Sequence, residues 1–221
     1  MSRPPVAERL AAFYEKHLRK RPQQSRSRSV VEAILIAALE GMVRTGDEEA
    51  LTVQDVAQRA GVGIGSLYDY FRDRESLLAV VAAKVTEDNL KAFEALLSRT
   101  GEMSLREAVS AFVDFALDTY LKDPRVPRSV LRIATGLGLM SMLAEGQRIF
   151  SDQLATELAK RQDIAVRDIR HAAYVCTQSV MGLVQARIWE ESPTTTLEEA
   201  RGAMIDMLTV YLSGGTEARP T

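Results

Sequence analysis

Residues 51–78, LTVQDVAQRAGVGIGSLYDYFRDRESLL, contain the pattern that decides the fold. The pair Thr52 and Asp55 predicts a capping box, in which a hydroxyl and a carboxylate each satisfy a free backbone N–H at a helix start. Apolar residues then recur at helical spacing as far as Gly61, a residue that can take the positive φ that ends a helix. A second short helix follows from Gly63 or Ile64. Two short helices around a glycine turn form a helix-turn-helix, the minimal arrangement for laying a helix in the DNA major groove.

A third, longer helix completes this stretch. Asp73 is expected to cap it, because an aspartate oxygen can accept from the backbone N–H groups of the first turn. We expect Leu67 and Phe71 to point inward and Val62 to fill the space between the two short helices. The segment therefore predicts helices packed around one small apolar core.

The same segment resembles the DNA-binding domain of the TetR family of bacterial transcriptional regulators, from Arg28 to about Lys84. The resemblance rests on many residues at fixed spacing. They are Val31, Ile34, Ala37 and Ala38, then Thr52, Val56, Ala57, Ala60, Gly61 and Val62, then Leu67, Tyr68, Tyr70 and Phe71, and finally Glu75, Ser76, Leu77 and Leu78. Gly63 departs from the pattern, because the family often has a serine there that caps the recognition helix. Glycine caps less well by roughly a few tenths of a kcal/mol.

Composition sets limits on the class of protein. The chain has 221 residues, of which 46% are hydrophobic and 26% charged, as in ordinary globular proteins of one large or two small domains. Its wholly apolar runs, such as residues 34–39, are far shorter than the ~18 residues of a membrane span, and we expect no signal peptide. The single Cys176 excludes an internal disulfide and favours a reducing cytoplasm.

Positive charge is concentrated near the N-terminus, although the formal net charge is −2. Residues 16–28 contain six Lys and Arg and no Asp or Glu. Beside a helix-turn-helix, such a run favours an arm that faces DNA, since attraction to phosphate needs a local basic surface rather than a basic protein. A solvated tail and a segment lying on a membrane surface are the alternatives.

Helical spacing continues through the rest of the chain without a strand pattern, so the predicted fold is all-α with about nine helices. We divide it into a basic N-terminal extension (residues 1–25), a helix-turn-helix DNA-binding domain (26–84), a helical regulatory and dimerisation domain (85–215) and a tail (216–221). Further capping boxes are expected at the first, fifth and last helices. They are Ser29 with Glu32, Ser104 with Glu107, and Thr196 with Glu199.

The resemblance implies which residues contact double-stranded DNA. They are Gln54, Ile64, Gly65, Ser66, Tyr68, Asp69, Tyr70 and Arg74, to which the basic segment adds Arg28. Side-chain chemistry suggests their roles: Gln54 can pair with adenine, Ile64 can contact a thymine methyl, and Tyr68 can donate to a phosphate oxygen.

Two sets of residues in the C-terminal half suggest further partners. The last two expected helices carry small and apolar residues. The resemblance to the TetR family implies that these helices pair with their copies in a homodimer, and a two-fold dimer suits a near-palindromic operator. The expected interface residues are Cys176, Ser179, Leu183, Ala186, Met204, Leu208 and Tyr211. Large apolar residues could surround a small-molecule effector, namely Phe93, Phe112, Phe115, Tyr120, Met140, Met142 and Phe150. Plain intramolecular core is the alternative for both sets.

The sequence contains no motif for catalysis, a metal or a cofactor. The glycines of residues 61–65 lack the preceding strand and the following Lys of a phosphate loop. Asp168 and His171 are expected to be a surface pair, and the acidic pair Glu48 and Glu49 is expected to be solvated or to cap a helix. We therefore do not expect an enzyme.

These features predict a cytoplasmic, dimeric, all-α transcriptional regulator, a repressor that a small apolar or amphipathic ligand releases from DNA. A TetR-like activator and a regulator without an effector are alternatives. A helical ligand-binding or enzymatic domain with a degenerate helix-turn-helix is an alternative of another class.

Overall fold

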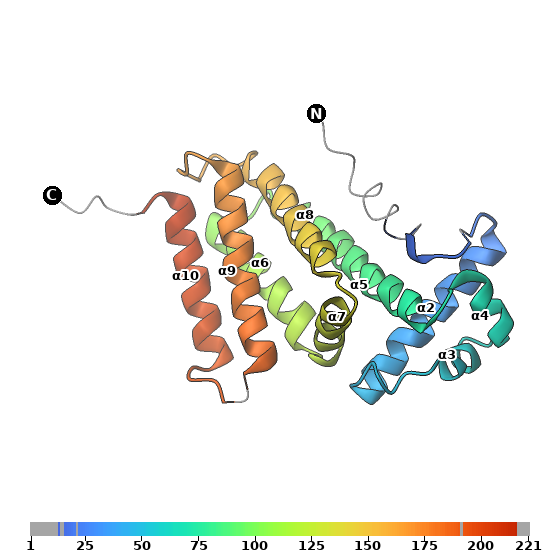
Figure 1. Ribbon diagram of the computed structural model, residues 1–221. Coiled ribbons are helices and arrows are strands. Elements are labelled where there is room, and N and C mark those ends of the chain that lie inside the picture. The colour runs from blue at the N-terminus through green and yellow to red at the C-terminus, as the bar shows by residue number, and fades with distance from the viewer. Residues whose placement is uncertain (1–12, 14–15, 21, 191, 216–221) are drawn as a thin grey trace. The chain divides into compact units, whose positions relative to one another are not determined.

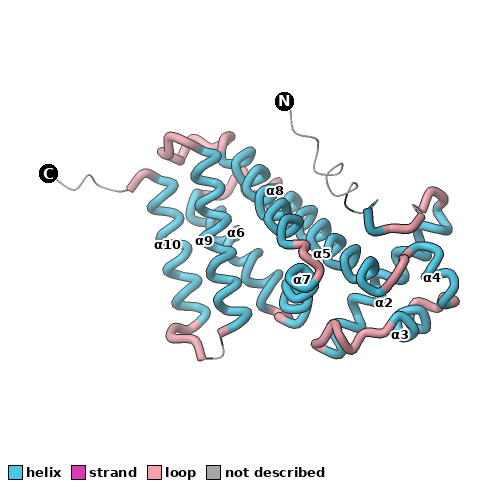
Figure 2. Tube along the Cα trace, in the orientation of Figure 1, coloured by secondary structure: helices cyan, strands magenta, loops and turns pink. Residues whose placement is uncertain are grey.

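The computed structural model describes residues 13, 16–20, 22–190 and 192–215. Within these residues the regular structure is helical, apart from one isolated antiparallel bridge between Leu18 and Phe71 (Figure 1, Figure 2). The helices are α2 (Ser25–Thr45), α3 (Val53–Arg59), α4 (Ile64–Tyr70), α5 (Arg74–Leu97), α6 (Leu105–Leu121), α7 (Arg125–Gly136), α8 (Met140–Leu158), α9 (Ile169–Trp189) and α10 (Leu197–Ser213). The all-α prediction is confirmed.

The chain folds into two compact units. The N-terminal unit contains the described residues up to Asp88 together with Arg125–Ala144, and the C-terminal unit contains Asn89–Pro124 together with the described residues from Glu145 onward. Each of α5 and α8 therefore contributes residues to both units. Sequence patterns suggested one boundary near residue 85, with α7 beyond it, whereas α7 packs against α2 in the N-terminal unit.

Apolar side chains from α2, α3, α4, α7 and the first half of α5 form the core of the N-terminal unit. Ile34, Met42, Leu67 and Phe71 are fully buried there, and Val62 packs against the same core. The inward orientation predicted for Leu67 and Phe71 is confirmed. Burial of one large apolar side chain contributes about 1.5–3 kcal/mol, so this core fixes the two short helices against α2.

Two of the predicted capping boxes are confirmed. At the start of α6, the Ser104 hydroxyl accepts from the backbone N–H of Glu107, and the Glu107 carboxylate accepts from the backbone N–H of Ser104 at 2.8 Å. Thr196 and Glu199 form the same pair at the start of α10. Hydrogen bonds from the capping residues hold the pKa of both glutamates below the ordinary value. Each cap stabilises its helix by about 1 kcal/mol.

The capping box predicted at Ser29 and Glu32 is wrong. Helix α2 begins one turn earlier, at Ser25, and the backbone N–H of its N-cap Gln24 donates to the Ser27 hydroxyl at 3.2 Å. Ser29 lies inside the helix, where its hydroxyl donates to the Ser25 carbonyl at 3.1 Å. Several side chains in this segment can bond the backbone, so spacing alone did not decide which of them starts the helix.

In the C-terminal unit, α6 packs against both α9 and α10. Arg201 of α10 donates to both carboxylate oxygens of Asp114 on α6, with an Nη2 to Oδ2 distance of 2.8 Å, and holds the pKa of Asp114 below its ordinary value. Asp168 caps α9 by accepting from the backbone N–H of His171 at 2.9 Å. No helix within the described ranges is long and apolar enough to cross a membrane.

Candidate nucleic-acid interface

The segment from α3 to α4 has the geometry of a helix-turn-helix. Thr52 is the N-cap of α3: its hydroxyl accepts from the N–H of Asp55 at 3.1 Å and donates to the Asp55 carboxylate at 2.7 Å. The Asp55 carboxylate accepts from the Thr52 hydroxyl and not from the Thr52 backbone N–H. Of the two backbone hydrogen bonds predicted for this capping box, only one therefore forms. Gly61 has a φ of 66°, and the N–H of Val62 donates to the Ala57 carbonyl at 3.0 Å, which closes the turn.

Helix α4 has one buried face and one exposed face. Leu67 is fully buried, whereas Ile64 and Tyr68 are 40% and 39% exposed. Tyr70 is half-buried and packs against the core of the N-terminal unit. The other exposed residues of the predicted site are Gln54, Gly65, Ser66, Asp69 and Arg28. A face that offers hydroxyl, amide and apolar groups suits contacts to base edges and phosphates.

Gly63 and Gly65 leave the backbone of α4 open on this face. Gly63 is the N-cap with a φ of −67°, and Gly65 lies in the helix, so neither has the positive φ that demands glycine. A Cβ atom added to either residue would meet nothing within 4 Å. Packing within the protein therefore does not explain these glycines, and they allow another molecule to approach the α4 backbone closely.

Arg74 holds the loop that precedes α3. Its side chain is half-buried, and its guanidinium donates to the carbonyl oxygen of Leu51 at 2.8 Å and to that of Glu48. These hydrogen bonds occupy the guanidinium with the protein's own backbone. It is therefore less available to a phosphate than the sequence suggested.

Glu48 is buried and its carboxylate pairs with a distant arginine, so the prediction that it is solvated or caps a helix is wrong. Only 9% of its side chain is exposed, and its carboxylate accepts from Nε of Arg132 on α7 at 2.7 and 3.0 Å. Arg132 also donates to the Gly46 carbonyl at 3.0 Å, and its hydrogen bond to the carboxylate raises the pKa of the guanidinium. No local pattern could reveal this pair, because its members are 84 residues apart.

The helix-turn-helix carries little positive charge. Residues 52–73 contain two Arg and three Asp, and α4 itself contains no Lys or Arg. Hydrogen bonds from Ser76 hold the pKa of Asp73 below its ordinary value of 3.8, so this carboxylate is ionised at neutral pH. The two arginines of residues 52–73, Arg59 and Arg72, are exposed, and further exposed cations lie in the preceding segment, at Lys16, Arg19, Lys20, Arg26 and Arg28.

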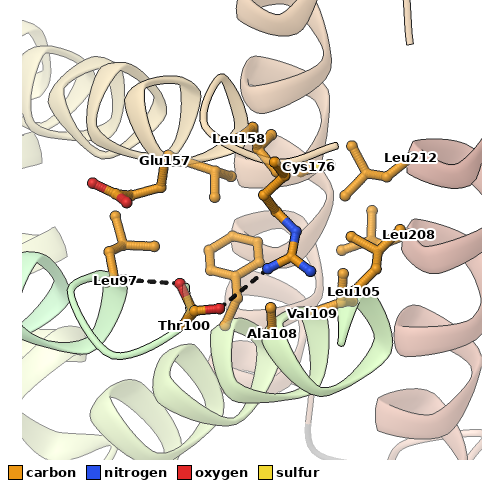
Figure 3. A pocket seen from close by; sticks show the side chains of 13 residues that line it. Leu97, Thr100, Leu105, Ala108, Val109, Glu157, Leu158, Cys176, Leu208 and Leu212 are labelled. Carbon is orange, nitrogen blue, oxygen red and sulfur yellow. Dashed lines mark hydrogen bonds between the residues drawn. The ribbon is translucent and has the colours of Figure 1, made fainter. Parts of the chain in front are cut away.

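The C-terminal unit contains a small apolar cavity of about 30 Å³ (Figure 3). Its lining includes Leu97, Val109 and Leu208, together with Arg161. The Arg161 guanidinium donates to the Thr100 carbonyl at 3.1 Å and is paired within the unit. Within the described ranges, no group of three or more His, Cys, Asp or Glu side chains could hold a metal ion.

A second cavity, of about 20 Å³, brings together five of the seven residues predicted to bind a ligand, namely Phe93, Phe112, Phe115, Tyr120 and Phe150. Burial raises the pKa of Tyr120, whose hydroxyl accepts from Nδ2 of Asn89 at 3.5 Å. The other two predicted residues lie elsewhere: Met140 is 52% exposed, and Met142 is in the core of the N-terminal unit. The reason is that the first turn of α8 belongs to the N-terminal unit.

Helices α9 and α10 carry several exposed large apolar side chains. They include Tyr174, Trp189, Met207, Val210 and Tyr211. Of the seven predicted interface residues, Ala186 and Tyr211 are exposed, Ser179, Leu183 and Met204 are half-buried, and Cys176 and Leu208 are buried. Burial raises the pKa of the Cys176 thiol to about 12. The predicted set mixes inward and outward positions, because small residues also line the side of α9 that packs within the unit.

Both halves of the chain match families of transcriptional regulators. Residues 34–81 match the family described as "Bacterial regulatory proteins, tetR family", and residues 104–212 match "Tetracyclin repressor-like, C-terminal domain". The chain belongs to the TetR family of bacterial transcriptional regulators. In this TetR-family regulator, α3 and α4 form the DNA-binding helix-turn-helix.

Solved structures share this fold, among them two described as TetR-family regulators. One from Mesorhizobium loti has a TM-score of 0.68 at 14% identity, over 84% of this chain and 97% of that one. One from Rhodococcus sp. has a TM-score of 0.63 at 23% identity, over 84% and 99%. The reduced form of E. coli NemR has a TM-score of 0.64 at 16% identity, over 87% and 100%. At these identities the likeness shows the fold alone, and no curated protein sequence matches the chain.

Proposed function

We propose that this TetR-family regulator is a dimeric repressor that reads a near-palindromic operator with α4 and releases it when a small molecule binds. One observation carries the proposal: α4 buries Leu67 and turns Ile64, Ser66 and Tyr68 outward. In a helix-turn-helix, that outward face is the one that enters the major groove.

The exposed residues divide into those that read bases and those that position the protein. Gln54 can bond two edges of adenine, Ser66 can donate or accept at a base edge, and Ile64 can contact a thymine methyl. Tyr68 can donate to a phosphate oxygen, which fixes the register without reading sequence. Asp69 is repelled by phosphate and is expected at the rim of the contact.

Dimerisation is supported by the exposed apolar side chains of α9 and α10. Tyr174, Trp189 and Met207 are each about half exposed, and aromatic and Met side chains are enriched in protein interfaces. A two-fold dimer would place two copies of α4 about 34–36 Å apart, which matches successive major grooves. The half-buried interface residues would then form the edge of this contact.

The effector is expected in the C-terminal unit, where two apolar cavities lie between the helices. Their volumes of about 30 and 20 Å³ are far below the ~300–1,000 Å³ of typical ligand sites. An apolar or amphipathic ligand must therefore select a more open conformation of this unit. It would release DNA only through a higher affinity for that conformation.

A repressor meets its operator on the chromosome, so we place this protein in the cytoplasm and assign it no catalytic activity. A regulator that activates transcription, or that responds to no ligand, would share the same DNA-reading face.

Selection of genomic fragments by the purified protein tests the proposal, followed by fluorescence anisotropy on the selected site at fixed salt. Tyr68→Phe should weaken binding to all sequences, whereas Gln54→Ala should also relax the preference at particular base pairs. Gln162→Ala, an exposed glutamine of the C-terminal unit, is the matched control. Unchanged affinity and preference in both variants would disprove this site, and the lack of any enriched palindrome would favour a helical ligand-binding or enzymatic domain.

A further inference from the structure

We propose that residues 16–20 form an arm that binds the phosphate backbone of the operator beside α4. The inference rests on the proposed reading of DNA by α4 and adds a second contact surface to it. Its partner is double-stranded DNA, because the arm is attached to the end of the helix that reads DNA.

Backbone hydrogen bonds fix the arm at the end of α4. The N–H of Arg19 donates to the Tyr70 carbonyl at 2.8 Å, and Leu18 forms an antiparallel bridge with Phe71. Nη1 of Arg19 also lies 3.4 Å from the Tyr68 carbonyl oxygen. Carbonyl groups in the last turn of a helix have no partner within the helix, so the arm supplies donors that α4 lacks. The arm is thus placed relative to α4 as an element of the fold.

Other side chains of the arm pack against the protein, whereas its three cations are exposed to solvent. Leu18 packs against the core of the N-terminal unit. Burial, followed by the nearby charge of Lys16, lowers the pKa of His17 below 6.5, so His17 is neutral at pH 7. Lys16, Arg19 and Lys20 are exposed and carry the charge of the arm.

The charge distribution shows why such an arm is needed. Helix α4 has no Lys or Arg, residues 52–73 contain more Asp than Arg, and the Arg74 guanidinium is occupied by backbone carbonyls. Affinity for DNA comes largely from cations that neutralise phosphates and release counterions. Three exposed cations within five residues, next to the last turn of α4, meet this requirement.

Salt dependence of operator binding tests the arm in the full-length protein. The variant Lys16→Gln, Arg19→Gln and Lys20→Gln removes the three charges without touching the core. For full engagement in a dimer, the slope of log K against log salt should become less steep by about 5, at about 0.9 for each of six phosphates. The base preference should stay the same, because phosphate contacts carry no sequence information. The control replaces three exposed cations of the C-terminal unit with Gln, at Arg99, Lys122 and Arg167, and should keep the slope.

A second variant separates a fixed arm from a charged tail. Leu18→Ala keeps every charge but removes the apolar anchor, and should weaken operator binding by about 3–10-fold, because the arm must then be ordered on binding. The proposed arm is refuted if the unmodified protein binds the operator normally and the triple variant shows an unchanged salt slope. The proposed function would then still stand. An equal loss of slope in the control would also overturn the proposed arm. Failure of the unmodified protein to bind any selected DNA would overturn both proposals.

Discussion

Replacing Gly65 with Ala should have opposite effects on folding stability and on DNA binding. Ala is favoured over Gly by about 0.8–1.0 kcal/mol in a helix interior. Gly65 lies in the first turn of the seven-residue α4, where only part of this difference applies. Because a Cβ at Gly65 meets nothing within 4 Å, no clash offsets the gain. Gly65→Ala should therefore stabilise the free protein by about 0.5 kcal/mol, which raises Tm by about 1–2 °C in a chain of this size.

The same methyl group should weaken binding to the operator. If the α4 backbone approaches DNA closely at Gly65, the added carbon must be accommodated in a packed contact, at a cost of about 1–3 kcal/mol. A dimer incurs this cost in both half-sites. The total of about 2–6 kcal/mol corresponds to a loss of affinity of at least about 30-fold.

Urea unfolding at fixed protein concentration measures the first effect, and fluorescence anisotropy on the selected operator measures the second. Gly202→Ala in α10 is the matched control, because its Cβ also meets nothing within 4 Å and it lies far along the chain from α4. The control should gain stability and keep its affinity. Full operator affinity in Gly65→Ala would refute the close approach, and a loss of stability would refute the account of the open α4 surface.

Three other substitutions probe the rest of the molecule. Arg132→Leu should destabilise the protein by about 2–3 kcal/mol in urea unfolding, more than Glu48→Gln at about 1–2 kcal/mol, because it strands a carboxylate that is only 9% exposed; equal costs would contradict this. Arg201 lowers the pKa of Asp114, so this pair stabilises the fold above pH 3.8 and loses its effect as pH falls through the lowered pKa. Because the pair is partly exposed, Asp114→Asn should lower the free energy of unfolding by less than about 1 kcal/mol at pH 7. It should also make the free energy of unfolding less dependent on pH in the acid range. The Cys176 thiol, with a pKa of about 12, should stay unlabelled by a disulfide reagent at pH 8 until denaturant is added, and stoichiometric labelling of the native protein would contradict its burial.

Features that depend on neighbours in sequence were predictable. The N-cap at Thr52, the turn at Gly61 and the burial of Leu67 and Phe71 follow from residue types at fixed spacing; all of these form, although the capping box with Asp55 is only half made. A helix start is decided by backbone groups within one turn, so a short window of sequence contains the information. The failure at Ser29 has the same origin, because the window offered more than one residue able to start the helix.

Features that depend on residues distant in sequence were not predictable. The partner of Glu48 is on α7, and α7 joins the N-terminal unit although residues of the other unit precede it in the chain. Helical spacing predicts that one face of α9 is buried, but it does not identify the helix that packs against that face. Cys176 was therefore assigned to an interface, although it lies in the core of the C-terminal unit.

Because α4 contains no Lys or Arg, the proposed contacts assign base specificity and attraction to phosphate to different groups of residues. In the proposed contact, neutral groups such as Gln54 and Ser66 read the bases, and their contacts release no counterions and so add little to the salt slope. The proposed arm of residues 16–20 would add phosphate contacts, which do not distinguish bases. Variants of Gln54 and Ser66 should therefore change the preferred operator at constant salt slope, and variants of the arm should change the slope at constant preference. A variant of one group that alters both quantities would show that the two contacts are coupled through the bridge between Leu18 and Phe71.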